Sequence, residues 1–165
     1  MRLIMMAAAL WCATGALSAG PRGTLDVVDA VALAEKRLHG TVLEVESDHH
    51  KGEPVYEIEM IRGDTIHNIV LHRMSGELLS DTRPRLRRLR LRWFRGDEFR
   101  RLASIRLAPR LMEIGRRIRG RVTAIDYTRH DGEPWYDIRI ESAAGVAEVR
   151  LDPFSSRQFA LSASE

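Results

Sequence analysis

Two nearly identical phrases occur in the chain: HKGEPVYEIEM begins at His50 and HDGEPWYDIRI begins at His130. Aligning Gly40 with Gly120 keeps this register without a gap. Eight of the nineteen positions in 40–58 are then identical to their partners eighty residues later, whereas average residue frequencies give about one chance match. The chain is therefore internally duplicated, and its two halves are expected to share one fold.

Both copies of the phrase predict a β-hairpin. The turns are Lys51-Gly52-Glu53-Pro54 and Asp131-Gly132-Glu133-Pro134. Glycine supplies the positive φ of a tight turn, and proline is tolerated where a strand begins. Apolar residues alternate with charged ones after each turn, which is the period of a half-buried strand. These inward positions are Tyr56, Ile58 and Met60, then Tyr136, Ile138 and Ile140; a third strand carries Ile69 and Leu71, then Val149 and Leu151.

A helical period precedes the strands in both halves. Apolar residues recur at helical spacing as Val27, Val31, Ala34 and Leu38, and again as Leu107, Leu111, Ile114 and Ile118. Pro109 suits a helix start, and Gly40 and Gly120 suit a helix C-terminal cap. We therefore predict an α+β fold with two repeats of a helix followed by a three-stranded antiparallel sheet, packed as a pseudo-dimer. The repeats are expected at 24–81 and 106–161, joined by a connector at 82–105.

The first residues indicate a signal peptide over 1–19. A basic start is followed by an apolar run too short to span a bilayer, and small residues place the cleavage near residues 16–19. Cys12 is the chain's only cysteine. Its removal with the signal excludes disulfides, thiolate metal sites and a cysteine nucleophile from the mature protein.

Charge is distributed very unevenly along the chain. The segment 22–82 has a net charge of −6 and 122–165 a net charge of −4, whereas 83–121 carries fifteen arginines and a net charge of +12. Two acidic lobes thus flank one arginine-rich connector.

The pattern of each half resembles the PepSY family. The residues that carry the resemblance are Gly40, Val42, Tyr56, Ile58 and Ser75-Gly76-Glu77 in the first half, and Gly120, Val122, Tyr136, Ile138 and Asp152 in the second. His72 stands where the family often has aspartate, and Ser155-Ser156 replaces the Ser-Gly. The resemblance implies an exported domain without catalytic activity that restrains peptidases or serves as a sensory or interaction module. By the same resemblance, Gly40, Gly52, Pro54, Tyr56, Gly120, Gly132, Pro134 and Tyr136 are mostly structural.

The connector sequence leaves two interpretations open. Its arginines form either a solvated connector that pairs with the acidic lobes or a docking surface for an acidic partner. The expected partner-binding residues are Arg85, Arg87, Arg88, Arg90, Arg92, Trp93 and the outward-facing Trp135. Trp135 could equally lie in a contact between the two halves. Leucine spacing in the connector fits either a helix or a short strand.

No constellation of catalytic residues is present in the sequence. His49, His50 and His130 lie at the expected hairpin tips without a metal-binding spacing, so solvated turns explain them, and no metal or cofactor is expected. We therefore predict a non-enzymatic periplasmic protein that binds and modulates an envelope protein, either a peptidase or a membrane sensor. A small-ligand, haem or metal sensor is the alternative. Attachment to an anionic membrane is a further possibility, and no nucleic-acid partner is expected.

Overall fold

The structure is a computed structural model that describes residues 23–83, 94, 97–155 and 157–164. The first half contains one helix and four strands: α1 (Val27–Leu38), β1 (Thr41–His50), β2 (Glu53–Arg62), β3 (Thr65–His72) and β4 (Leu78–Thr82). The second begins with a short helix: α3 (Glu98–Leu102), α4 (Ala108–Ile118), β5 (Arg121–His130), β6 (Glu133–Ser142), β7 (Gly145–Leu151) and β8 (Gln158–Ser164). In the described residues, no helix is long and apolar enough to cross a membrane.

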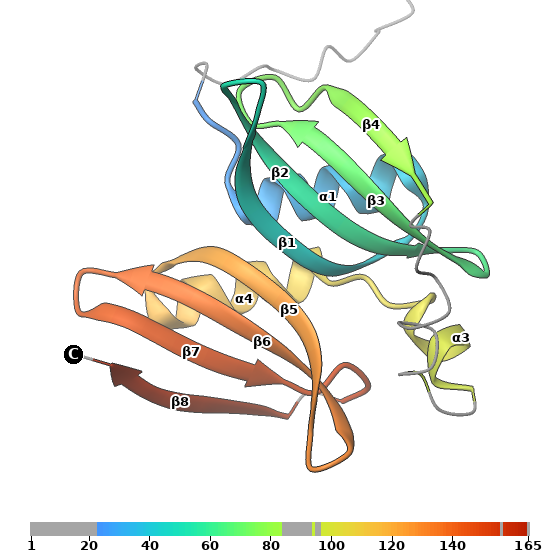
Figure 1. The fold of residues 1–165 in the computed structure, drawn as a ribbon. Helices are drawn as coiled ribbons and strands as arrows, with labels where there is room; N and C mark the ends of the chain where they lie inside the picture. The colour runs from blue at the N-terminus through green and yellow to red at the C-terminus, as the bar shows by residue number, and fades with distance from the viewer. Residues whose placement is uncertain (1–22, 84–93, 95–96, 156, 165) are drawn as a thin grey trace, which may run out of the picture.

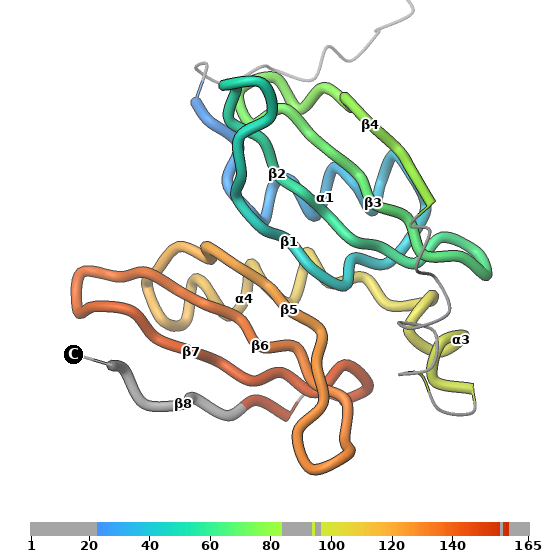
Figure 2. The backbone as a smooth tube through the Cα atoms, in the orientation of Figure 1, coloured from blue at the N-terminus to red at the C-terminus, as the bar shows by residue number. Residues whose placement is uncertain are grey.

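The strands of the described residues all belong to one antiparallel sheet of eight strands, in the order β4-β3-β2-β1-β5-β6-β7-β8. The halves meet at its centre, where Glu44 and Val45 of β1 pair with Asp126 and Ile125 of β5. Helices α1 and α4 lie side by side on one face of this sheet (Figure 1). Figure 2 shows that the chain leaves β4 at an outer edge and that β5 enters next to β1.

The predicted α+β class is confirmed, but the prediction of three strands per repeat is wrong. Strand β4 adds to β3 and β8 adds to β7, so each half contributes four strands. Leu78 and Leu79 in β4 are 39% and 43% exposed. Such a strand has no buried alternating face, and the period-two signal that identifies other strands is therefore missing.

The duplication extends to irregular features of the backbone. A β-bulge follows Val42 in β1 and Val122 in β5. Both hairpin turns place two successive residues at positive φ, Lys51-Gly52 at 54° and 87° and Asp131-Gly132 at 53° and 83°. Two positive φ values are typical of the type I′ turn, whose twist matches that of the strands.

Gly40 and Gly120 do not cap the helices in the expected way. The left-handed residues at the helix ends are His39 and Arg119, with φ of 52° and 56°. The glycines are required instead by close packing. A Cβ on Gly40 would lie 2.3 Å from the carbonyl oxygen of Ile61, and a Cβ on Gly120 would lie 2.5 Å from a side-chain carbon of Ile140.

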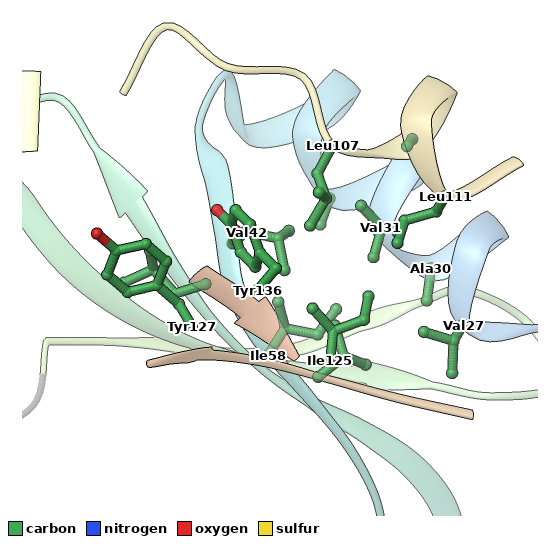
Figure 3. Packing of buried hydrophobic residues seen from close by; sticks show 14 of the residues in the cluster. Val27, Ala30, Val31, Val42, Ile58, Leu107, Leu111, Ile125, Tyr127 and Tyr136 are labelled. Atoms are coloured by element: carbon green, nitrogen blue, oxygen red, sulfur yellow. The ribbon is translucent and has the colours of Figure 1, made fainter. Parts of the chain in front are cut away.

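One hydrophobic core runs through both halves. Val27, Ala30 and Val31 of α1 face the sheet beside Leu107 and Leu111 of the second half (Figure 3). Asp26 begins α1 by accepting a hydrogen bond from the backbone N–H of Asp29 at 2.7 Å, and Pro109 lies in the first turn of α4. The shared core explains how two short repeats obtain enough buried surface.

Candidate functional site

The predicted contact residues of the connector lie outside the residues that the structure describes. They are Arg85, Arg87, Arg88, Arg90, Arg92 and Trp93. The described chain ends at Arg83, just after β4, and resumes fully at Asp97. The role of these residues therefore stays a prediction, whereas both flanks of the segment can be located.

An aromatic cluster anchors the connector to the second half. The Phe94 ring stacks on Tyr127 with 5.7 Å between ring centroids and meets Phe99 edge-on at 5.1 Å. Tyr127 in turn meets Tyr136 edge-on at 5.3 Å. These contacts attach the region around α3 to β5 and β6.

A buried carboxylate strengthens this anchor. The Tyr127 hydroxyl and the Arg129 guanidinium both donate hydrogen bonds to Glu98, which is 7% exposed. Burial raises the pKa of Tyr127 above its usual range, and the hydrogen bond to Glu98 raises it further. The phenol therefore stays a proton donor, and loss of Glu98 would leave Arg129 without this carboxylate in a poorly hydrated place.

The chain after α3 crosses to the first half. Leu102 and Leu107 are fully buried. The Thr41 hydroxyl donates to the carbonyl of Ile105 at 2.9 Å, and Arg106 donates to the carbonyl of Gly40 at 3.4 Å. Residues 102–107 thus fill a groove beside the end of α1 and the start of β1.

Glu35 joins the two helices at this groove. Its Oε1 accepts a hydrogen bond from the backbone N–H of Leu107 at 2.8 Å, and its Oε2 accepts one from Ala108 at 3.3 Å. Burial raises the pKa of Glu35, while the two amide hydrogen bonds and Arg106 counteract the shift. A carboxylate at the start of α4 also interacts favourably with the helix dipole.

A row of carboxylates crosses the sheet face opposite the helices. Four acidic residues are direct cross-strand neighbours on β6, β5, β1 and β2, and they are Asp137, Asp126, Glu44 and Glu59. They alternate along their strands with core residues and so point away from the helices. Like charges in direct register destabilise a sheet. Such a row needs cationic partners, and Arg150 is one, at 3.2 Å from Asp137.

Trp135 lies half-buried on β6, paired with Thr128 of β5. It lines a hollow of about 320 Å³ together with Arg101 of α3 and Phe154. Arg101 lies over the Phe154 ring at 3.9 Å. Trp135 is thus adjacent to the connector's anchored end.

The two family-motif tyrosines are buried but use different acceptors. Tyr56 donates to the carbonyl of Leu25 at 2.9 Å, within its own half. Tyr136 donates to the carbonyl of Val42 at 2.8 Å and so links the halves. Burial raises the pKa of both phenols. The motif residues Gly52, Pro54, Gly132 and Pro134 lie at the hairpin turns and the strand starts that follow them.

The histidines named in the sequence lie at hairpin tips. His49 and His50 are exposed, and His130 lies 2.7 Å from a carboxylate oxygen of Asp137. Across the described part of the chain, no three potential metal ligands come together.

Sequence reasoning did not single out His67, which is buried on β3. Its Nε2 lies 2.8 Å from the hydroxyl of Thr65, and its Nδ1 lies 2.6 Å from a carboxylate oxygen of Asp81. Asp81 also accepts a hydrogen bond from Arg62 at 3.0 Å. This network ties the edge strand β4 to β2 and β3.

Glu35 and Glu98 were also not identified from the sequence. Glu35 had a visible signal, because it falls on the apolar face of the predicted helix, four positions after Val31. Glu98 had none, because its partners Tyr127 and Arg129 reach it only through the tertiary fold.

An open groove of about 790 Å³ lies between the start of α1 and the end of α4. Its apolar lining includes Val28 and Ala32 of α1, and Leu111, Met112 and Gly115 of α4. Met112 is 52% exposed. The size is within the range of about 300–1,000 Å³ that is usual for ligand pockets.

Comparisons with known proteins match one part of the chain to a family. Residues 24–82 match the family model described as "Peptidase propeptide and YPEB domain", the PepSY family. No curated protein matches the chain significantly. The chain is similar to a crystal structure described as "a putative lipoprotein" from Clostridium difficile 630, at 11% identity and a TM-score of 0.42, over 82% of this chain and 91% of that one. This likeness is too weak to support an argument about fold or function.

Proposed function

Since residues 24–82 match the PepSY family model, we propose that the protein is an exported, non-catalytic module that binds another envelope protein and modulates it. The family match is the observation that carries this proposal. PepSY domains are typically propeptide or regulatory domains without catalytic activity. The proposed partner is a peptidase or a membrane sensor.

Export is supported by the apolar segment that follows Met1-Arg2, although this segment lies outside the described residues. We place the mature protein in the periplasm, in the sense that it is exported across the inner membrane. Cleavage near residues 16–19 would leave the PepSY domain close to the new N-terminus.

We further propose that residues 106–161 are a second PepSY-like repeat and that the two repeats form a pseudo-dimer. The family model matches only the first repeat, so this assignment depends on the duplication. Its support is the set of shared backbone features: the bulges after Val42 and Val122, the paired turns, and the close-packed Gly40 and Gly120.

The proposed contact is the arginine-rich segment together with Trp93 and with Trp135, which lies beside Arg101 of α3. Both flanks of the segment are fixed, one by β4 and the other by the stacking of Phe94 on Tyr127. A partner with an acidic surface would attract these arginines. The binding is therefore expected to weaken with added salt, because exposed charges are screened.

A crosslinked pull-down of the mature protein from native envelope extract tests this function. The matched experiment changes Arg85, Arg87, Arg88, Arg90 and Arg92 to alanine. A control variant, Arg117→Ala, removes an arginine of α4 whose side chain is 63% exposed.

We expect the native protein and the control to recover the same peptidase or sensor and the connector variant to lose it. Recovery by all three would reject the connector as the contact. Recovery of anionic lipid alone would replace the protein partner with a membrane surface. Absence of any recovered protein would reject the proposed function.

A further inference from the structure

Two grooves beside the helices are formed by equivalent residues of the two halves, which lie eighty positions apart in the sequence. One lies beside the end of α1 and the start of β1, around Glu35, Gly40 and Thr41. The other lies beside the end of α4 and the start of β5, around the related residues Gly115, Gly120 and Arg121. In both grooves the helix is followed by a residue at positive φ, His39 or Arg119, and the strand has a β-bulge after Val42 or Val122.

The first groove is filled by this chain's own residues 102–107. Leu107 is fully buried, and three hydrogen bonds join the backbone of Ile105, Leu107 and Ala108 to Thr41 and Glu35. The groove thus accepts the short connection between α3 and α4, which carries apolar side chains.

The second groove is the open one of about 790 Å³. The segment that precedes α1 does not enter it, because Leu25 is held on its own half. The backbone N–H of Leu25 donates to the carbonyl of Arg73 at 2.8 Å, and its carbonyl accepts from the Tyr56 hydroxyl at 2.9 Å. The open groove therefore has apolar walls that no segment among the described residues covers.

Differences between the two grooves indicate the chemistry of an occupant. Glu35 accepts hydrogen bonds in the filled groove, and its counterpart Gly115 has no side chain. His39 and Thr41 correspond to the cationic Arg119 and Arg121. Arg121 pairs with Glu141 at 3.0 Å, whereas Arg119 has no ion-pair partner among the residues that the structure describes. The open groove thus offers the hydrogen-bond donors of Arg119 and Arg121, whereas the filled groove offers Glu35 as an acceptor.

We propose that this open groove binds a short extended segment of a partner protein, with apolar side chains on the groove floor and a carboxylate against Arg119. Asp26 and Asp29 line the opposite end of the groove, so the carboxylate belongs at the α4 end. The inference rests on the proposed function, since it names a second contact for the same partner.

Two peptides based on residues 102–107 are suitable probes. One is the natural sequence, Leu-Ala-Ser-Ile-Arg-Leu, and the other carries Arg106→Glu. Arg106 donates to the carbonyl of Gly40 in the filled groove, so its replacement would lie near Gly120 and Arg119 in the open one. Fluorescence anisotropy with the mature protein measures affinity, and amide NMR shifts of Gly115 and Gly120 report the location.

We expect saturable binding of the acidic peptide and affinity lower by about tenfold for the natural one. Ala32→Trp and Met112→Glu should each lower the affinity for the acidic peptide by about tenfold. The tryptophan would fill the groove, and the glutamate would repel the peptide's carboxylate. Met74→Glu is the matched control, since Met74 and Met112 are both 52% exposed. The variant Arg119→Glu should reverse the preference in favour of the natural peptide, and this gain of binding requires a folded protein.

Failure of both peptides to exceed a scrambled polar peptide would overturn the proposal. Equal binding by the Ala32→Trp, Met112→Glu and Met74→Glu variants would also overturn it. Failure of the groove proposal can be distinguished from failure of the pull-down. A partner recovered through the connector with no peptide binding would reject the groove alone. Peptide binding without any recovered protein would reject the proposed function and leave the groove as a peptide-binding site.

Discussion

The Glu35 carboxylate of α1 accepts a hydrogen bond from the backbone N–H of Leu107, at the start of α4, with 2.8 Å between oxygen and nitrogen. The two residues are separated by 72 positions in the sequence. A side chain from the first half therefore completes the helix start of the second. The contact lies in the one of the two related grooves that the chain fills by itself.

Replacing Glu35 tests the importance of this contact. Glu35→Ala would leave the buried amides of Leu107 and Ala108 without their acceptor and should lower the free energy of unfolding by about 2 kcal/mol. Glu35→Gln keeps one acceptor oxygen and should cost less than about 1 kcal/mol. Urea denaturation measures both. Equal stability of the alanine variant and the native protein would show that water replaces Glu35.

Replacing Glu98 should lower the free energy of unfolding more than replacing Glu35. Glu98→Ala removes a nearly buried carboxylate from the side of Tyr127 and Arg129, so the free energy of unfolding should fall by about 3 kcal/mol. The exposed pair of Glu113 with Arg117 supplies the control, and Glu113→Ala should change stability by at most about 0.5 kcal/mol. Similar losses from the two variants in the same denaturation assay would contradict a special role for Glu98.

A third prediction concerns the close-packed glycines Gly40 and Gly120. A Cβ on Gly40 would lie 2.3 Å from a backbone oxygen, so Gly40→Ala should cost about 3 kcal/mol, and Gly120→Ala should cost a similar amount. Gly63 has a φ of +62° but nothing within 4 Å of its Cβ position. Gly63→Ala should therefore cost only about 1 kcal/mol of backbone strain. Thermal unfolding measures the loss of stability in each variant. A larger loss for Gly63→Ala than for Gly40→Ala and Gly120→Ala would contradict this explanation.

Lowering the pH should reduce the folding stability of the protein through protonation of Asp152. Burial alone would raise its pKa, but hydrogen bonds from Ser155 and the amide of Phe154, together with Arg157, lower it below the usual value. A lowered folded-state pKa gives stability that is present above the unfolded pKa, about 3.9, and is lost as pH falls through the folded value.

Glu35 acts in the opposite direction, because its raised pKa favours the protonated form in the folded state. Denaturation measured between about pH 5 and pH 2 should show a shallower loss of stability for Asp152→Asn and a steeper loss for Glu35→Gln. An unchanged pH dependence in the Asp152→Asn variant would argue against the role assigned to Asp152.

Much of the local structure could be predicted from the sequence because its signals are local. The period of Tyr56 and Ile58 predicts a half-buried strand, and Lys51-Gly52 predicts the hairpin turn. The helical face was predicted from Val27 and Val31 in the same way. These features depend on side-chain direction and backbone freedom within a few residues, and the duplication presents each signal twice.

The arrangement of the site depends on longer-range contacts. The sequence does not reveal that Val45 pairs with Ile125, because a strand edge exposes the same backbone groups whatever its side chains are. That pairing creates the eight-stranded sheet and brings Asp126 next to Glu44. The sequence by itself thus determined the repeated helix-and-hairpin unit and its inward faces. Only the tertiary structure decided the edge at which the two units join, the contact of Glu35 with Leu107, and which groove stays open, because these depend on backbone pairing and packing between distant residues.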